Sequence, residues 1–291
     1  MNFNPITSAD INEYLDQSDD FDFELQVARI FSDSKIRCQH NGTYADPVTG
    51  KYREYDIRAF HKINNIGILF TVECKNISDI KPLIISCVRR KPQESFHKLI
   101  KWEPVSKDSD DSFTFLQYSQ KTIKTISKSD LYPSEEFTGK SMNQISKNQN
   151  KLIGSDAEIF SKFSQAISSG IQWESENSDV NVSASLKCEY FIFIPVVVIP
   201  NNKLWVVEYN NMNRAEPKTV DQCTYFIRHQ FKKKKKVVSV HKNGPQIDRT
   251  YNASHLHFFT VDGLTNFISY MVSKPLLFKD MILPPESLEH A

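Results

Sequence analysis

Two apolar runs constrain the fold of this chain more than any other feature of its sequence. Residues 66–72 and 190–199 are hydrophobic at almost every position and rich in β-branched side chains. A strand with one face in water alternates apolar and polar residues, so continuous runs indicate strands that are buried on both faces. Such strands need helices on both sides of their sheet. The sequence therefore predicts an α/β fold with a central mixed β-sheet flanked by helices.

Three segments carry apolar side chains at helical spacing and are expected to cover this sheet. The first is 20–31, whose apolar stripe begins at Phe21. The second begins at Ser155 or Asp156 and is expected to bury Ile159, Phe160, Phe163, Ala166 and Ile167 on one face. It is expected to end at Gly170, because glycine favours the left-handed conformation that stops a helix. The third begins with Asp262 as its N-cap.

Turn residues and composition suggest how the strands are connected. Asp46-Pro47-Val48-Thr49-Gly50 and Asn64-Asn65-Ile66-Gly67 predict two hairpin turns. A strand at 82–88 and a mixed helical segment at about 94–100 are expected to follow. Residues 104–150 are rich in Ser, Lys, Asp and Asn, which indicates loops with short interspersed elements. We therefore expect a single domain over residues 1–285 with a polar, loop-rich insertion at about 104–150.

The bulk composition is that of a folded protein in a reducing compartment. The net charge of +1 does not indicate an acidic partner. The five cysteines are scattered and form no CxxC pair, which favours reduced thiols over disulfides or a zinc site. The N-terminal residues are acidic and lack the apolar core of a secretory signal. The longest apolar run is about half of the roughly 20 residues that span a bilayer. A cytoplasmic protein without membrane contact is predicted.

The stretch Glu73-Cys74-Lys75 ends one of the apolar strands with two charged groups. Because side chains alternate along a strand, Glu73 and Lys75 share one face, about 6–7 Å apart. Asp56, on the preceding strand, lies near Glu73 if the two strands pair through the Asn64-Asn65 turn. Two neighbouring carboxylates repel each other unless a cation lies between them. Carboxylate oxygens are hard ligands, so Mg²⁺ is the expected cation.

These residues resemble the PD-(D/E)xK nuclease superfamily, which has the restriction-endonuclease-like fold. The resemblance rests on Asp56, a gap of sixteen residues, and then Glu73-Cys74-Lys75 after an apolar strand. It implies a Mg²⁺- or Mn²⁺-dependent endonuclease that hydrolyses DNA phosphodiester bonds in genome defence or DNA processing. It further implies that Asp56 and Glu73 are metal ligands, that Lys75 is the catalytic lysine, and that Glu24 on the leading helix is an auxiliary acid. One departure is Tyr55, where the motif's name has proline.

Two basic segments are candidates for contact with a nucleic-acid backbone. The first is an unbroken run of five lysines: Lys232, Lys233, Lys234, Lys235 and Lys236. Such a run is either a solvated loop or a patch that binds phosphates, because like charges repel unless an anion gathers them. The second segment, Arg89, Arg90 and Lys91, directly follows the strand predicted at 82–88.

Other polar residues are interpreted as structural. His255 and His257 have the spacing of two ligands on one strand face, but core or edge histidines are expected because no third ligand is near in sequence. Gln39 and His40 are expected to be structural or peripheral, and Glu54 an exposed hairpin residue or a group beside the site. The alternative to a nuclease is a protein of the same fold that binds nucleic acid or a protein partner without cutting. The sequence leaves open DNA or RNA as substrate, and a homodimer or a regulatory protein partner.

Overall fold

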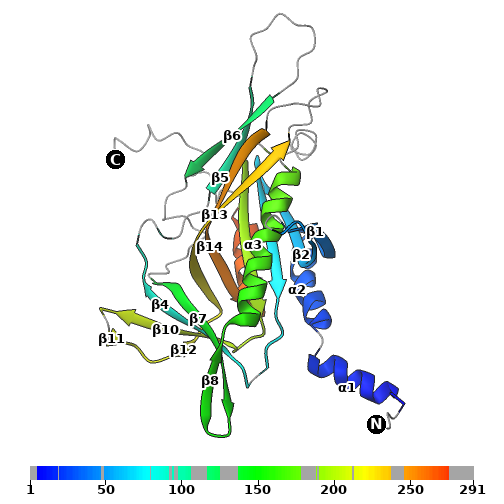
Figure 1. Cartoon of the computed structure of the whole chain (residues 1–291), viewed down its shortest axis with the longest axis vertical. Helices are drawn as coiled ribbons and strands as arrows, with labels where there is room; N and C mark the ends of the chain where they lie inside the picture. Colours follow the sequence, from blue (N-terminus) through cyan, green and yellow to red (C-terminus); the bar gives the residue numbers. More distant parts are fainter. Residues whose placement is uncertain are drawn as a thin grey trace, which may run out of the picture.

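A large mixed β-sheet forms the centre of the molecule (Figure 1). The computed structural model describes residues 5–18, 20–46, 49–78, 80–91, 94, 98–105, 117–124, 137–177, 188, 190–211, 213–236 and 246–274. The helices in these ranges are α1 (Ser8–Ser18), α2 (Phe21–Asp33), α3 (Ala157–Asn177) and α5 (Val261–Ser273). The strands are β1 (Arg37–Ala45), β2 (Tyr52–Ile63), β3 (Ile66–Cys74), β4 (Leu83–Arg89), β5 (Lys98–Val105), β6 (Gln117–Lys124), β7 (Phe137–Asn148), β8 (Lys151–Ser155), β9 (Tyr190–Ile199), β10 (Leu204–Asn210), β11 (Asn213–Arg214), β12 (Lys218–Thr219), β13 (Gln222–Lys236) and β14 (Gln246–Thr260).

The first three strands form an antiparallel meander with the two turns that the sequence predicts. β1 pairs with β2 around the turn at Asp46, whose carboxylate accepts a hydrogen bond from the Thr49 N–H at 2.9 Å. β2 pairs with β3 around Asn64, which adopts a left-handed φ of 54° that asparagine tolerates well. β3 then pairs in parallel with β9, and β9 in parallel with β14. β3 therefore lies inside the sheet, and every residue along it is buried, as its apolar run predicts.

Helices cover both faces of this part of the sheet, which confirms the predicted α/β class. On one face, Phe31 of α2 and Phe267 of α5 pack against Phe70 of β3, with ring centroids 5.6 and 6.5 Å apart. On the other face lies α3, where the Ala166 carbonyl accepts a hydrogen bond from Thr71 Oγ1 at 2.7 Å. None of the helices in the described ranges is long and apolar enough to cross a membrane.

The predicted buried faces of α2 and α3 are confirmed in part. In α2 the buried residues are Phe23, Val27, Ala28 and Phe31, whereas Phe21 is 46% exposed. Ala28 and Phe31 are buried as predicted, but the start of the predicted stripe was wrong, because α2 turns Phe23 toward the sheet and leaves Phe21 exposed. In α3, Ile159, Phe163, Ala166 and Ile167 are buried as predicted, and the prediction was wrong only for Phe160, which is 53% exposed.

Two predicted helix boundaries were wrong for local reasons. α3 continues past Gly170 to Asn177. A Cβ atom at position 170 would lie 2.0 Å from the Phe193 ring, so this glycine serves close packing against β9 and does not end the helix. α5 is capped by Thr260, whose side-chain oxygen accepts a hydrogen bond from the Gly263 N–H at 3.1 Å. Asp262 lies in the first turn of that helix, where its negative charge interacts favourably with the positive end of the helix dipole.

The region between β4 and α3 contains more strand than the sequence suggests. Residues 98–100 belong to β5, so the helix predicted near them was wrong for this stretch. β5 also pairs with β9, and this non-local contact cannot be read from the local composition. Within the segment 104–150 the structure describes β6 and β7, and β7 pairs with both β4 and β13.

Candidate functional site

Asp56 and Glu73 lie on neighbouring strands at the C-terminal end of β3. The pairing of Ile57 with Val72 sets the register that brings the two carboxylates to the same place. Asp56 Oδ2 also accepts a hydrogen bond from the Cys74 N–H at 2.7 Å, which ties its side chain to the end of β3. The two acids are 8% and 1% exposed. The sheet therefore buries a carboxylate pair, and such a pair needs a cation.

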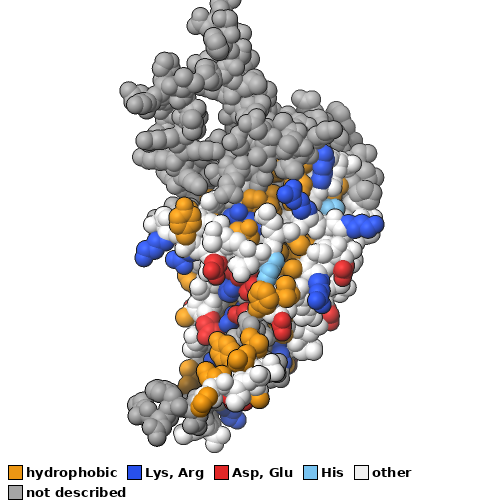
Figure 2. Space-filling view, turned by 90° about the vertical axis from the view of Figure 1, so that its right-hand side faces the viewer, with side chains coloured by type: hydrophobic (Ala, Val, Ile, Leu, Met, Phe, Trp, Pro, Cys, Tyr) orange, Lys and Arg blue, Asp and Glu red, His pale blue; other side chains and the backbone are white. Residues whose placement is uncertain are grey.

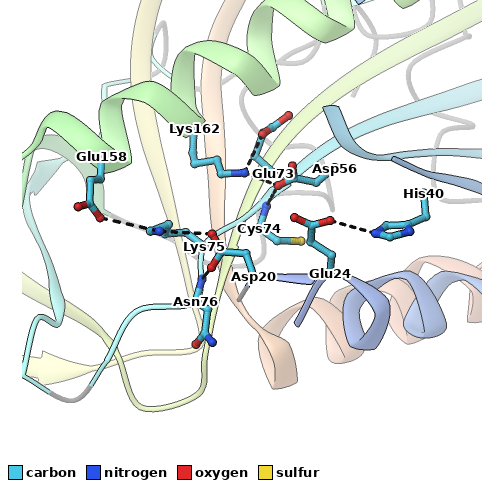
Figure 3. Close-up of polar contacts among 10 residues, drawn as sticks. All are labelled: Asp20, Glu24, His40, Asp56, Glu73, Cys74, Lys75, Asn76, Glu158 and Lys162. Atoms are coloured by element: carbon cyan, nitrogen blue, oxygen red, sulfur yellow. Dashed lines mark hydrogen bonds and ion pairs between the residues drawn. The ribbon is translucent and has the colours of Figure 1, made fainter. Parts of the chain in front are cut away.

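Lys162 of α3 supplies a positive charge to this pair. Its Nζ lies 2.6 Å from Asp56 Oδ2 and 3.4 Å from Glu73 Oε2 (Figure 3). Two further contacts fix the position of α3 over the strands: Thr71 Oγ1 donates to the Ala166 carbonyl, and Arg58 Nη2 donates to the Ser169 carbonyl at 2.9 Å. Because residues 162, 166 and 169 lie on one face of the helix, these contacts direct Lys162 at the acids.

Burial and charge together change the proton affinities of the site. Burial raises the pKa of Glu73 well above its usual range, and the neighbouring Asp56 carboxylate raises it further, while Lys162 opposes both effects. For Lys162, burial works against the charged form, but Glu73 and Asp56 outweigh it and raise the pKa of the ammonium group. Lys162 is therefore charged at neutral pH and is held by its two acidic neighbours.

Lys75 lies beside the carboxylate pair and has other partners. Its backbone N–H donates to the Val198 carbonyl at 2.9 Å, which continues the pairing of β3 with β9. Its Nζ lies 3.3 Å from Asp20 Oδ2 and 3.9 Å from Glu158 Oε2. Asp20 also accepts the Asn76 N–H at 2.9 Å and so joins the start of α2 to the segment after β3. Figure 3 shows Lys75 between Asp20 and Glu158, below Lys162.

Glu24 and His40 form a second polar contact next to the pair. Glu24 lies one turn into α2, and its Oε2 is 3.0 Å from His40 Nε2 of β1. Burial raises the pKa of Glu24, and the Asp56 carboxylate raises it further, while His40 and Lys162 oppose these effects. The negative charge of Asp56 thus acts on Glu24. His40, expected to be structural or peripheral, is the hydrogen-bonding partner of Glu24.

The chemistry of the donor set suits a hard divalent ion that keeps much of its water. Among the described residues, no group of three or more His, Cys, Asp or Glu side chains is arranged to hold a metal. Asp56 and Glu73 nevertheless direct carboxylate oxygens at one cationic group, the Lys162 ammonium. Mg²⁺ is commonly held by one or two carboxylates, with water and phosphate oxygens completing its shell. The pair therefore fits Mg²⁺ or Mn²⁺ better than an ion that needs many protein ligands.

The two basic segments lie apart from this site in the sheet order. Arg89 ends β4, and four strands (β9, β14, β13 and β7) separate β4 from β3. Lys232, Lys233, Lys234, Lys235 and Lys236 belong to β13 and pair along the backbone with β14 from Thr250 to Gln246. The run is therefore part of an extended hairpin. Figure 2 shows Lys and Arg side chains scattered over the described part of the face that it views, without a single basic field.

The other polar residues singled out in the sequence have structural positions. Glu54 is exposed on β2, as predicted. His255 and His257 are buried in β14 with their Nε2 atoms 3.1 Å apart. The His257 ring stacks on Phe259 at a centroid distance of 5.5 Å, in line with the expected core histidine.

Sequence reasoning missed Lys162, Asp20 and Glu158. A signal for Lys162 was present, because position 162 falls between Ile159 and Ala166 at helical spacing. A lysine on the apolar stripe of a helix indicates a buried acidic partner. Asp20 and Glu158 gave no comparable signal, since acids near a helix N-terminus are common for electrostatic reasons alone.

Comparison with known proteins gives no relative from which a function could be transferred. The chain matches no protein-family model, no curated protein and no solved structure.

Proposed function

We propose that this chain is a divalent-metal-dependent nuclease of restriction-endonuclease-like fold that hydrolyses phosphodiester bonds of DNA. The observation that carries the proposal is the buried carboxylate pair of Asp56 and Glu73, which come from adjacent strands and share one cationic neighbour at a strand end. The order of elements around it also supports the proposal. A helix bearing Glu24 precedes three antiparallel strands, and a helix over their face and a parallel strand follow.

Asp56 and Glu73 would hold Mg²⁺ or Mn²⁺ in this function. The ion would supply an activated water molecule and stabilise negative charge on the phosphoryl oxygens. The hydrogen bond from the Cys74 N–H orients Asp56, and the burial of Glu73 keeps bulk water from competing for its oxygens. Glu24, held by His40, adds negative charge beside Asp56 and so favours a cation there.

Lys75 would act on the substrate side of the site. Its ammonium group is within 3.3 Å of Asp20 and 3.9 Å of Glu158, and it is partly exposed. Ion pairs that reach solvent are weak, so a phosphate anion could compete for this lysine. There it would offset the negative charge on the phosphoryl oxygens during attack.

A second candidate function is binding of nucleic acid or of a protein partner without cutting. One observation favours it: Lys162 already occupies the space between the two carboxylates, as a structural ion pair would. The two functions differ in their need for metal. A binding protein would keep its affinity in EDTA and would show no turnover with any divalent ion.

Plasmid and single-stranded DNA incubated with Mg²⁺, Mn²⁺ or EDTA would test the proposal. We expect cleavage with either ion and none in EDTA. Asp56→Ala, Glu73→Ala and Lys75→Ala should each abolish cleavage, and the two carboxylate variants should also lose metal binding. Circular dichroism of each variant would check that it is folded. Cleavage by Lys75→Ala at the parental rate would show that this lysine has no catalytic role.

A further inference from the structure

The Lys162 ammonium group occupies the place beside Asp56 and Glu73 where a metal ion would have to bind. Its Nζ contacts Asp56 Oδ2 at 2.6 Å and Glu73 Oε2 at 3.4 Å, and its side chain is 18% exposed. Figure 3 shows it reaching from α3 toward the two acids on β2 and β3. An ammonium group and a divalent ion cannot share this space, because both are cations that need the same oxygen lone pairs.

The position of Lys162 is set by the packing of α3 and not by the pair alone. Four residues further along the helix, the Ala166 carbonyl accepts the Thr71 hydroxyl at 2.7 Å. After another three residues, Ser169 receives two hydrogen bonds from the buried Arg58, at 3.2 Å to its Oγ and 2.9 Å to its carbonyl. Lys162 is therefore held over the carboxylates by a helix that cannot slide along the strands without breaking these contacts.

The carboxylate pair needs a compensating positive charge even in the absence of metal. Two ionised carboxylates at close range, both shielded from water, destabilise the folded state unless a cation lies between them or one of them binds a proton. Among the described residues, the ion pairs of both acids converge on the Lys162 ammonium, whereas those of Lys75 go to Asp20 and Glu158. The two lysines near the site thus have different partners.

We infer that Lys162 is a tethered counter-ion that competes with the divalent metal for Asp56 and Glu73. Without metal, its ammonium group neutralises the pair and holds α3 to the sheet. Metal binding displaces the ammonium group from between the carboxylates and leaves it on the rim of the site. This inference rests on the proposed function only in that the pair binds a divalent ion, and it holds whether or not DNA is cut.

Titration of the full chain with Mn²⁺ tests the competition, because the paramagnetic resonance signal of free Mn²⁺ measures binding without any substrate. Lys162→Met removes the charge and keeps a chain of similar length. It should bind Mn²⁺ at least about tenfold more tightly than the wild type, since close charge pairs couple by that factor or more. Lys140→Met is the matched control, because the Lys140 ammonium pairs with Glu94 at 2.7 Å and contacts neither acid of the site, so its affinity for Mn²⁺ should stay close to that of the wild type.

A second measurement follows the metal-free protein. In EDTA the melting temperature of Lys162→Met should fall below that of the wild type, because the carboxylates lose their cation. Mn²⁺ should raise the melting temperature of Lys162→Met more than that of the wild type. If Lys162→Met does not fold in EDTA, Mn²⁺ should restore its folding, and a failure of Mn²⁺ to do so would overturn the inference.

The outcomes separate this inference from the nuclease proposal. Equal or weaker Mn²⁺ binding by Lys162→Met overturns the competition, even if the wild type cuts DNA in Mg²⁺. Tighter binding by Lys162→Met supports the competition, even if the wild type cuts no DNA and the nuclease proposal fails. Binding by Lys162→Met alone would also support it, with the lysine then closing the site completely. Absence of Mn²⁺ binding in both proteins overturns the competition and the metal site together.

Discussion

Glu73 is the residue on which the electrostatics of the site depend. It is 1% exposed, and burial together with Asp56 raises its pKa well above the usual range. A side chain in that position is stable only while a cation or a proton is present. Both the structural role of Lys162 and the proposed affinity for a metal follow from the burial of the Glu73 carboxylate.

Glu24 offers a prediction at the edge of the same site. If it favours the metal through its charge beside Asp56, Glu24→Gln should slow cleavage partially and raise the Mg²⁺ concentration needed for half-maximal activity. Mg²⁺ titrations of the cleavage rate would measure this. Glu54→Gln is the matched control, because Glu54 is exposed on β2. An unchanged Mg²⁺ dependence in Glu24→Gln would reduce its role to the hydrogen bond with His40.

His257 gives a prediction for pH. Burial lowers the pKa of His257 to about 3, whereas an unfolded histidine titrates near pH 6.5. The unfolded state therefore binds the proton first, so the stability contributed by neutral His257 is complete above about pH 6.5 and is lost as pH falls toward 3. Between about pH 7.5 and pH 5.5 the loss should be about 1.4 kcal/mol.

Urea denaturation of the wild type and of His257→Phe at these two pH values would measure that loss. The variant should lose about 1.4 kcal/mol less than the wild type over the same interval. His61, whose pKa is also lowered by burial, is present in both proteins and cancels in the comparison. Equal pH dependence of the two proteins would show that His257 does not stay neutral in the folded state.

At the scale of elements, α3 has the central position because it carries Lys162 and packs over the ends of β2 and β3. Its close approach to β9 depends on Gly170, where an added Cβ would lie 2.0 Å from the Phe193 ring. Loss of this approach would tilt α3 and move Lys162 relative to Asp56.

Gly170→Ala should therefore destabilise the protein by about 1–3 kcal/mol through overpacking. In an exposed helix interior the same change would stabilise by about 1 kcal/mol, so the sign of the effect identifies the contact. Denaturant unfolding would measure it. Phe193→Leu in the Gly170→Ala background should recover part of the loss. A stabilised Gly170→Ala variant would contradict the close packing of α3 on β9.

The elements that could be predicted from sequence are those specified by local chemistry. Turn residues at Asp46 and Asn64 and the apolar runs of β3 and β9 determine the sheet around the site, and alternation along β2 and β3 places Asp56 beside Glu73. The continuation of α3 past Gly170 depends on a ring from a distant strand, and the partners of Lys75 depend on how α2 and α3 begin. These are tertiary contacts that leave no local pattern.

At the scale of the whole molecule, the proposed function requires that DNA, a polyanion, binds close to the acidic pair of Asp56 and Glu73. The described part of the face in Figure 2 has no single basic field. The run Lys232–Lys236 forms the last part of β13 and pairs with residues 246–250 of β14. If these lysines contact the backbone of a duplex, they add affinity without sequence specificity.

Replacing Lys232, Lys233 and Lys234 with serine tests whether the lysine run contacts the DNA backbone. Each phosphate contact on duplex DNA contributes about 0.9 to the slope of log affinity against log salt. The variant should bind all sequences more weakly, and its slope should be flatter by about two to three units. Binding measured in EDTA at several salt concentrations keeps the DNA intact. Serine at Arg89, Arg90 and Lys91 is the control with the same change of charge, and an effect on that variant alone would move the contact to the end of β4.

The most direct test of the central proposal compares the wild type with the Asp56→Asn, Glu73→Gln double variant. These replacements keep the shape of both side chains and remove both charges, and so remove the reason for a metal to bind. Supercoiled plasmid is incubated with each protein in Mg²⁺ and in EDTA, and nicked and linear products are followed over many turnovers. We predict products from the wild type in Mg²⁺ alone. Cleavage by the double variant at the wild-type rate, or by the wild type in EDTA, would contradict a metal-dependent nuclease built on this carboxylate pair.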